Sequence, residues 1–176
     1  MNDEGKKRKV IRLNAGDVFE FTASDGRLAY GVVVIGGKVP YVIILKSLHK
    51  TAPKLADLAS DEIALVGWTM DALVHHGRWR VVMHDYPARP DIPYPNWKLD
   101  LEGNLCVTDF SGKHSLGRLR PDEAHLDFRW SRAPIAFQLA LEALHGFGEW
   151  REDYSKLLAA NMGRQMTREP LPSGML

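Results

Sequence analysis

The stretch Gly16–Lys46, GDVFEFTASDGRLAYGVVVIGGKVPYVIILK, decides the fold of this chain. It contains three runs of β-branched and aromatic residues, which predict consecutive strands at Val18–Thr22, Leu28–Ile35 and Val39–Lys46. The runs are separated by Ser-Asp-Gly and Gly-Gly, and residues of these kinds adopt the positive φ angles that tight hairpins require. The stretch therefore predicts an antiparallel meander.

The second predicted strand is apolar on both of its faces. Tyr30, Val32 and Val34 share one face, and the residues that alternate with them are not polar either. A strand of this kind is covered on both sides, so another part of the chain must pack over the meander. The clearest helical pattern, Pro134–His145, has a wide apolar face, proline in its first turn and Gly146 just past its end. This helix is the natural cover.

Further short elements are predicted between and after these two segments. They are a strand at Glu62–Trp68, a short helix at Met70–His76, strands at Arg78–His84, Lys98–Leu101, Leu105–Phe110 and His114–Leu119, and a second C-terminal helix near Glu149–Asn161. Glu62–Trp68 also fits the start of a helix, but Thr69–Ala72 offers a fresh helix start, so the strand is preferred. The predicted fold class is α+β, with a mostly antiparallel, strongly curved or barrel-like sheet and C-terminal helices packed on it.

The length of the chain suits one domain. Its 176 residues fall within the usual size of a single domain, and residues 10–161 are expected to form one α+β unit. Within this unit the sheet occupies residues 10–119 and the helical part residues 122–161. Residues 1–9 contain the basic run KKRK and are expected to be a mobile, solvated arm, and residues 162–176 a loose tail.

The composition is ordinary for a water-soluble protein. Hydrophobic residues make up 45% and charged residues 26%, and 23 Lys and Arg against 22 Asp and Glu give a net charge of +1. This near-balance argues against a surface that neutralises many phosphates. Cys106 is the only cysteine, so no internal disulfide forms, and no apolar run approaches the roughly 18 residues of a membrane span. We expect a cytoplasmic, non-membrane protein, whose oligomeric state stays open.

Recognisable catalytic and metal-binding motifs are absent from the sequence. The seven histidines include no His-x-His or HExxH spacing, and no CxxC pair occurs. No G-x-S-x-G elbow is present, and Cys106 lies in a strand pattern that is typical of a small buried hydrophobe. The best single metal candidate is His84-Asp85 at a strand end, but a histidine on the surface or hydrogen-bonded in the core is the more common case. We therefore expect no catalytic residue, no metal and no cofactor.

Two segments interleave arginine with tryptophan, a pattern that occurs in nucleic-acid-binding surfaces. They are Arg78-Trp79-Arg80 and Arg129-Trp130-Ser131-Arg132, whose guanidinium and indole groups are able to stack on bases. A tryptophan at strand spacing is more often part of the core, with flanking arginines that reach solvent. We therefore do not expect nucleic acid to be the main partner.

The segment Asp85–Asn96, DYPARPDIPYPN, carries four prolines and is predicted to be an extended surface loop. Long ordered loops in compact domains are often functional, and rigid aromatic side chains bracketed by charge are typical of protein-binding sites. The candidate partner-binding residues in and after this loop are Asp85, Tyr86, Asp91, Tyr94, Trp97 and Asp100. The alternative is that the aromatic rings fold back and cover the edge of a sheet.

The opening of the meander resembles a known family. Ala15–Phe19 (AGDVF) and Gly26–Val33 (GRLAYGVV) are similar to the start of the immunity protein 26 family of bacterial polymorphic toxin systems, whose members open with a Gly-Asp strand and a Gly-Tyr-Gly-type second strand. Thr69–Trp79 resembles a later family segment, a short helix that ends in Gly-x-Trp before a strand. The resemblance covers Ala15 to about Pro87. It implies an α+β protein that binds and neutralises a cognate protein toxin by stoichiometric inhibition, without catalysis of its own.

The Gly-Asp-Val start is also similar to the small β-barrel of the PemK-like endoribonuclease toxins. The Arg-Pro-x-Leu-Val pattern that those toxins carry after their first loop is absent from this chain. The immunity protein is therefore the leading hypothesis. The alternative is a small β-barrel endoribonuclease that uses Arg78, His84 or Arg129 on RNA, or a nucleic-acid-binding module without catalysis.

Overall fold

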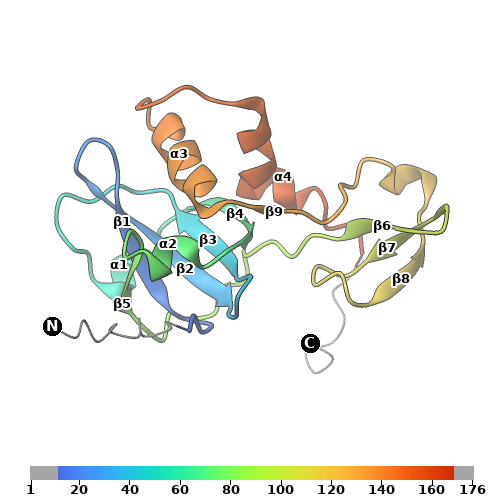
Figure 1. Cartoon of the computed structure of the whole chain (residues 1–176), viewed down its shortest axis with the longest axis horizontal. Helices are drawn as coiled ribbons and strands as arrows, with labels where there is room; N and C mark the ends of the chain where they lie inside the picture. Colours follow the sequence, from blue (N-terminus) through green and yellow to red (C-terminus); the bar gives the residue numbers. More distant parts are fainter. Residues whose placement is uncertain (1–11, 169–176) are drawn as a thin grey trace, which may run out of the picture.

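The computed structural model describes residues 12–168 and contains two β-sheets. The strands are β1 (Val18–Thr22), β2 (Leu28–Ile35), β3 (Tyr41–Leu45), β4 (Ile63–Thr69), β5 (Arg80–Met83), β6 (Trp97–Leu101), β7 (Asn104–Thr108), β8 (Ser115–Arg118) and β9 (Ser131–Arg132). The helices are α1 (Leu55–Ala59), α2 (Ala72–His75), α3 (Pro134–Leu144) and α4 (Ala159–Gly163), with 3-10 turns η1 (Pro121–Glu123) and η2 (Glu152–Leu157). Figure 1 shows the larger sheet on the left, the smaller one on the right and α3 and α4 above.

The predicted meander forms the centre of the larger sheet. Its strand order is β5-β1-β2-β3-β4-β9, in which every pair is antiparallel except β4 with β9. The sheet is therefore mixed, and among the described residues it ends at β5 and β9 and forms no closed barrel. The α+β class is confirmed, and the barrel-like form of the sheet is not.

The two apolar faces of β2 are both covered, as its sequence predicts. On one face Phe137 of α3 packs in a core with Phe19 and Trp79, whose rings stack with centroids 4.5 Å apart. Gly31 makes room for this stack, because a Cβ at that position would lie 2.3 Å from the Phe19 ring. The other face forms a second core, which Leu58 of α1 and the residues leading into the smaller sheet cover.

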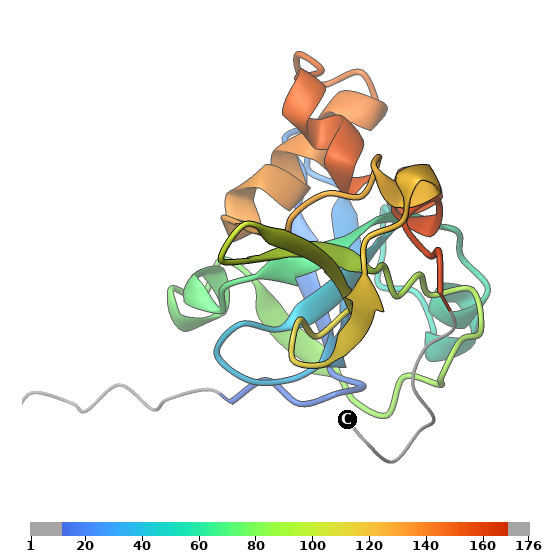
Figure 2. The same cartoon turned by 90° about the vertical axis from the view of Figure 1, so that its right-hand side faces the viewer.

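The smaller sheet is a hairpin with one additional strand, in the order β6-β7-β8. Leu101 pairs with Asn104, so the hairpin loop consists of Glu102 and Gly103, with φ angles of 53° and 86°. Positive φ at both loop positions is the geometry of the turn that matches the twist of a hairpin. In Figure 2 this smaller sheet faces the viewer and the larger sheet lies behind it.

The C-terminal part differs from the prediction after α3. The second helix predicted near Glu149–Asn161 is replaced by η2 and the short α4. Leu158, between them, has an extended backbone (φ −59°, ψ 127°) and forms a bridge with Leu65 of β4. Packing against the sheet therefore interrupts the helix, because an extended residue has no place in a continuous helical turn.

Residues 162–168, expected to belong to a loose tail, make specific contacts. Met162 is 1% exposed, and the guanidinium of Arg168 donates to both carboxylate oxygens of Glu123 at 2.7 Å. The expected mobile arm at residues 1–9 lies outside the described residues. No helix within residues 12–168 is long and apolar enough to cross a membrane.

Candidate functional site

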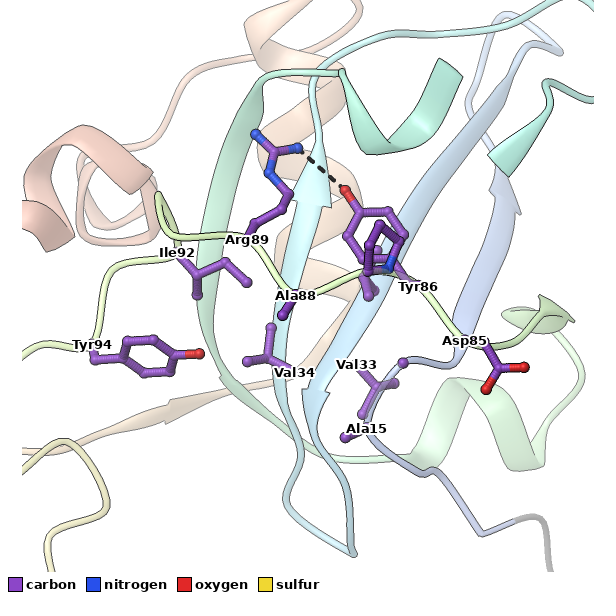
Figure 3. A pocket seen from close by; sticks show the side chains of 12 residues that line it. Ala15, Val33, Val34, Asp85, Tyr86, Ala88, Arg89, Ile92 and Tyr94 are labelled. Carbon is purple, nitrogen blue, oxygen red and sulfur yellow. Dashed lines mark hydrogen bonds between the residues drawn. The ribbon is translucent and has the colours of Figure 1, made fainter. Parts of the chain in front are cut away.

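The proline loop (Asp85–Asn96) is an ordered connection between the two sheets, without helix or strand. It runs from β5 across the second core to β6 (Figures 1 and 3). Its two ends are held by backbone hydrogen bonds: Tyr86 N donates to Gly16 O at 3.0 Å, and Asn96 N donates to Gln165 O at 2.9 Å. The predicted extended loop is confirmed.

Tyr86 and Arg89 attach the first half of the loop to α1 and to the connection between α1 and β4. The Tyr86 hydroxyl donates to Leu58 O at 3.1 Å and accepts a hydrogen bond from Arg89 Nη1 at 3.2 Å (Figure 3). Arg89 Nη1 also donates to Asp61 O. These bonds tie the loop to a second segment of the chain, so its conformation is set before any partner arrives.

Arg89 also binds Asp91 through a two-pronged ion pair. Nε donates to Oδ1 at 2.8 Å and Nη2 donates to Oδ2 at 2.5 Å, which is the strong, planar form of this interaction. The hydrogen bonds from Arg89 lower the pKa of the Asp91 carboxyl, and those to Asp91 raise the pKa of the Arg89 guanidinium. The exposed Asp91 therefore carries a charge that is already compensated within the loop.

Two of the predicted partner-binding aromatic residues are buried. Trp97 is 1% exposed and its Nε1 donates to Phe110 O at 2.8 Å, and Tyr86 is 8% exposed. Rings covered to this extent do not stand on a surface, which agrees with the alternative that they fold back over a sheet. The physical reason is that their large apolar area is buried against the sheet while their polar atoms find backbone partners. Tyr94 is half-buried, with its ring centroid 5.0 Å from that of Phe110.

The loop borders a hollow of about 360 Å³ over β2, which we call the loop hollow. Its lining includes Val34, Ala88 and Ile92, and Figure 3 shows Asp85 and Tyr94 at its opposite ends. The lining is therefore mainly apolar with charged or hydroxyl groups at the margins, which is the usual composition of a protein-binding or ligand-binding concavity.

The structure brings together some of the six predicted site residues and separates others. Asp85, Tyr86 and Tyr94 all line the loop hollow, and Asp91 lies next to it on the same loop. Asp100 is apart: its carboxylate accepts a hydrogen bond from Gly103 N at 2.7 Å in the β6–β7 hairpin. Asp100 is not among the residues that line the loop hollow, and the tip of that hairpin points away from the larger sheet (Figure 1).

Arg89 was not among the sequence-based candidates, although it organises the loop. A signal for it exists in the sequence, since Arg89 and Asp91 are two positions apart in a segment that proline keeps extended. Side chains at this spacing point to the same side of an extended backbone and are able to pair.

The indole rings of the two arginine–tryptophan segments are covered. Trp79 is 2% exposed in the stack with Phe19, and the partly buried Trp130 lies 6.2 Å from Trp97 with the Arg132 guanidinium over it at 5.2 Å. The Trp79 ring is therefore closed to a nucleotide base, and the Trp130 ring already has a guanidinium over it. The geometry supports the interpretation of these tryptophans as core residues.

The residues considered for RNA cleavage do not form one site. The His84 Nδ1 lies 2.6 Å from Asp17 Oδ1, whereas the Arg129 guanidinium lies over the ring of Trp68. Arg129 lines a hollow to which neither His84 nor Arg78 contributes. Within residues 12–168, no group of three or more His, Cys, Asp or Glu side chains is placed to hold a metal ion.

Strands β1 to β5 and the proline loop are also the part of the chain that is similar to a known family. The family model described as immunity protein 26 matches residues 14–101, which is half of the chain. The chain belongs to the immunity protein 26 family.

The immunity protein 26 match extends beyond Pro87, where the resemblance in the sequence was expected to end, and takes in the whole proline loop and β6. Every residue that lines the loop hollow lies within the matched range. The part of the chain from β7 to α4 follows the match. Comparisons with curated proteins and with solved structures found no match.

Proposed function

We propose that this member of the immunity protein 26 family binds a cognate protein toxin in the cytoplasm and neutralises it by forming a stoichiometric complex. Membership of the family carries this proposal. The mechanism is steric occlusion, in which a preformed surface covers the toxin without any catalytic turnover by the immunity protein.

The loop hollow is the contact surface that we propose for the toxin. The proline loop is held by Tyr86 and by the Arg89–Asp91 ion pair, so little conformational freedom is lost when a partner binds. The side-chain polar groups of Tyr86, Arg89 and Asp91 are already hydrogen-bonded within the protein, which lowers the cost of removing water from them. Both properties favour tight binding by a surface of modest size.

The proposed contact residues are the original candidates that lie at the loop hollow and remain accessible. Asp85 supplies charge at the margin, and Asp91 presents a carboxylate that is paired with Arg89. Tyr94 supplies a half-buried aromatic ring that is supported from behind by Phe110. A partly covered ring with rigid support is typical of the residues that dominate binding energy. Tyr86 and Trp97 support this surface from beneath.

The direct test is a binding measurement with the product of the neighbouring gene, prepared as an inactive variant if it is toxic. We expect a one-to-one complex by calorimetry and size-exclusion chromatography, and protection of cells that express the active toxin. Absence of a complex, together with absence of protection, would contradict the proposed function.

A matched pair of substitutions tests the proposed surface. Ala88 is exposed and lines the loop hollow, and Ala52 is exposed in a different loop. We expect Ala88→Arg to weaken toxin binding at least tenfold, because the long charged side chain fills the hollow, and Ala52→Arg to leave binding unchanged. Equal affinity of both variants would exclude the loop hollow while leaving toxin binding itself intact.

A further inference from the structure

A second hollow, of about 350 Å³, lies between the two sheets. We call it the intersheet cleft. One wall comes from the larger sheet and the other from the turn after β7 and the segment before β9. The lining residues on which the argument depends are Val39, Trp68, Phe110, Lys113, His114 and Arg129.

The ionisable side chains that line the cleft are basic or histidine side chains. Lys113, His114 and Arg129 contribute to the lining, and no carboxylate does. The neighbouring acid, Asp109, is 3% exposed and is occupied within the turn, where its carboxylate accepts hydrogen bonds from Ser111 Oγ and from the backbone N–H groups of Lys113 and His114. The side chains that line the cleft therefore carry positive charge, and no carboxylate among them neutralises it.

Arg129 is an exposed residue whose side chain packs against two other parts of the chain. Its guanidinium lies over the Trp68 ring at 4.5 Å from the centroid, and its Cδ occupies the space in which Gly112 would have a Cβ, only 2.8 Å away. Burial lowers the pKa of Arg129, and the nearby charge of Asp109 opposes this only in part. Within residues 12–168 its side chain makes no hydrogen bond and no ion pair.

A guanidinium that stacks on an indole ring and has no hydrogen-bonded anion is a favourable site for a carboxylate, because its N–H groups donate strong, charge-assisted hydrogen bonds to an incoming anion. Beside Arg129 the cleft is apolar, with Trp68, Phe110 and Val39, which is 44% exposed. The occupant that fits is an acidic side chain next to an apolar one.

We propose that the intersheet cleft binds an acidic side chain of the toxin together with its apolar neighbour. This inference rests on the proposed function and adds a second point of contact to it. The two hollows adjoin, since Tyr94 lines the loop hollow and Phe110 lines the cleft, and their rings pack against each other. One partner is therefore able to cover both.

The position of the cleft relative to the family match indicates its role. The loop hollow lies wholly within residues 14–101, whereas Lys113, His114 and Arg129 lie outside them. The cations of the cleft therefore belong to the part of the chain that the family model does not describe. We infer that these cations determine which toxin is bound, because a cationic pocket repels a partner that places a basic residue there.

The test with the toxin uses charge variants of Arg129 and of Arg78, an exposed arginine that does not line the cleft. We expect Arg129→Gln to weaken binding about tenfold and Arg129→Glu more than a hundredfold, a difference that salt reduces. The same changes at Arg78 should leave the dissociation constant within about twofold. Unchanged affinity of both Arg129 variants would overturn the inference but not the proposed function, whereas failure of the unaltered protein to bind would contradict the function itself.

A second test needs no toxin and uses the full chain. Phenylacetate imitates a carboxylate on an apolar group, and phenylacetamide is its uncharged counterpart. In NMR titrations we expect phenylacetate to shift the Trp68 indole signal and the amide signals of Lys113 and His114, and phenylacetamide to leave them unchanged. Arg129→Gln should abolish the response while the thermal midpoint stays the same. No shift with phenylacetate, or equal shifts with both compounds, would overturn the proposed chemistry of the cleft.

Discussion

The loop hollow and the intersheet cleft adjoin each other but handle their charges in opposite ways. At the loop hollow the guanidinium of Arg89 is paired with Asp91 and with backbone oxygen of Asp61. At the cleft the guanidinium of Arg129 rests on an indole ring and has no such partner among the described residues. The comparison shows that Arg89 stabilises the conformation of the proline loop, whereas Arg129 is available to bind a ligand.

This difference suggests separate roles: the loop hollow supplies a surface of fixed shape, and the intersheet cleft supplies selectivity between partners. A surface whose charges are internally paired loses little on desolvation and offers a fixed contour to any complementary partner. A surface with an unpaired cation gains from one kind of partner and is penalised by another. The four predictions below test whether the two regions differ in this way, in order of decreasing expected effect.

Trp97 supports both regions, and its loss should have the largest effect. It is 1% exposed, and its Nε1 donates to the backbone oxygen of Phe110. Phe110 lines the cleft and packs against Tyr94 of the loop hollow. We expect Trp97→Ala to reduce the free energy of unfolding by about 4 kcal/mol in urea denaturation. Phe128→Ala, at a ring that is 52% exposed, should change it by less than about 0.5 kcal/mol. Similar values for the two variants would show that Trp97 is not a core residue.

Acid should destabilise the protein through Glu123, next to the smaller sheet. Its side chain is 2% exposed, and hydrogen bonds from Arg168 lower its pKa from 4.5 to about 2. Because the pKa is lowered on folding, the carboxylate adds stability above pH 4.5 and this contribution, about 3 kcal/mol, is lost as the pH falls towards 2. Urea denaturation over this pH range should show the loss.

The matched control for this effect is Glu123→Gln, which keeps the shape of the side chain. It should be less stable than the unaltered protein near neutral pH and should lose less stability on acidification, because its amide does not titrate. An identical acid dependence of the two proteins would show that another group is responsible.

Arg89 and Arg129 should respond differently to the same substitution. We expect Arg89→Gln to cost about 2 kcal/mol of stability, since it removes charged hydrogen bonds to Asp91 and to the Asp61 backbone. Toxin binding should also weaken, because the loosened loop must be ordered on association. Arg129→Gln should weaken binding without changing the thermal midpoint. Equal loss of stability in both variants would remove the distinction between the paired and the unpaired arginine.

The smallest effect is expected at Asp100. The residue is exposed, and Asp100→Ala removes one hydrogen bond to Gly103 N, so the free energy of unfolding should fall by less than about 0.5 kcal/mol. Toxin affinity should not change, since the β6–β7 hairpin tip points away from the larger sheet. A tenfold loss of affinity would extend the interface to the smaller sheet.

Local patterns in the sequence were sufficient for much of the fold. The meander, the helix Pro134–Leu144 and the β6–β7 hairpin could be predicted because each depends on residues close together in the chain. The break between η2 and α4 could not, because Leu158 is held in an extended conformation by a bridge to Leu65, a residue far away in the sequence. Local propensity contains no information about such a contact.

The sequence by itself determined that the protein is α+β, that its central strand is covered on both faces, and that a stiff proline loop follows β5. Only the tertiary structure decided which aromatic rings of that loop are buried, and which arginine is paired. Whether a side chain such as Trp97 or Arg129 meets solvent, core or a counter-charge depends on segments brought together by folding. Burial and pairing are therefore properties of the assembled surface, and our proposal of partner contacts at the two adjoining hollows rests on them.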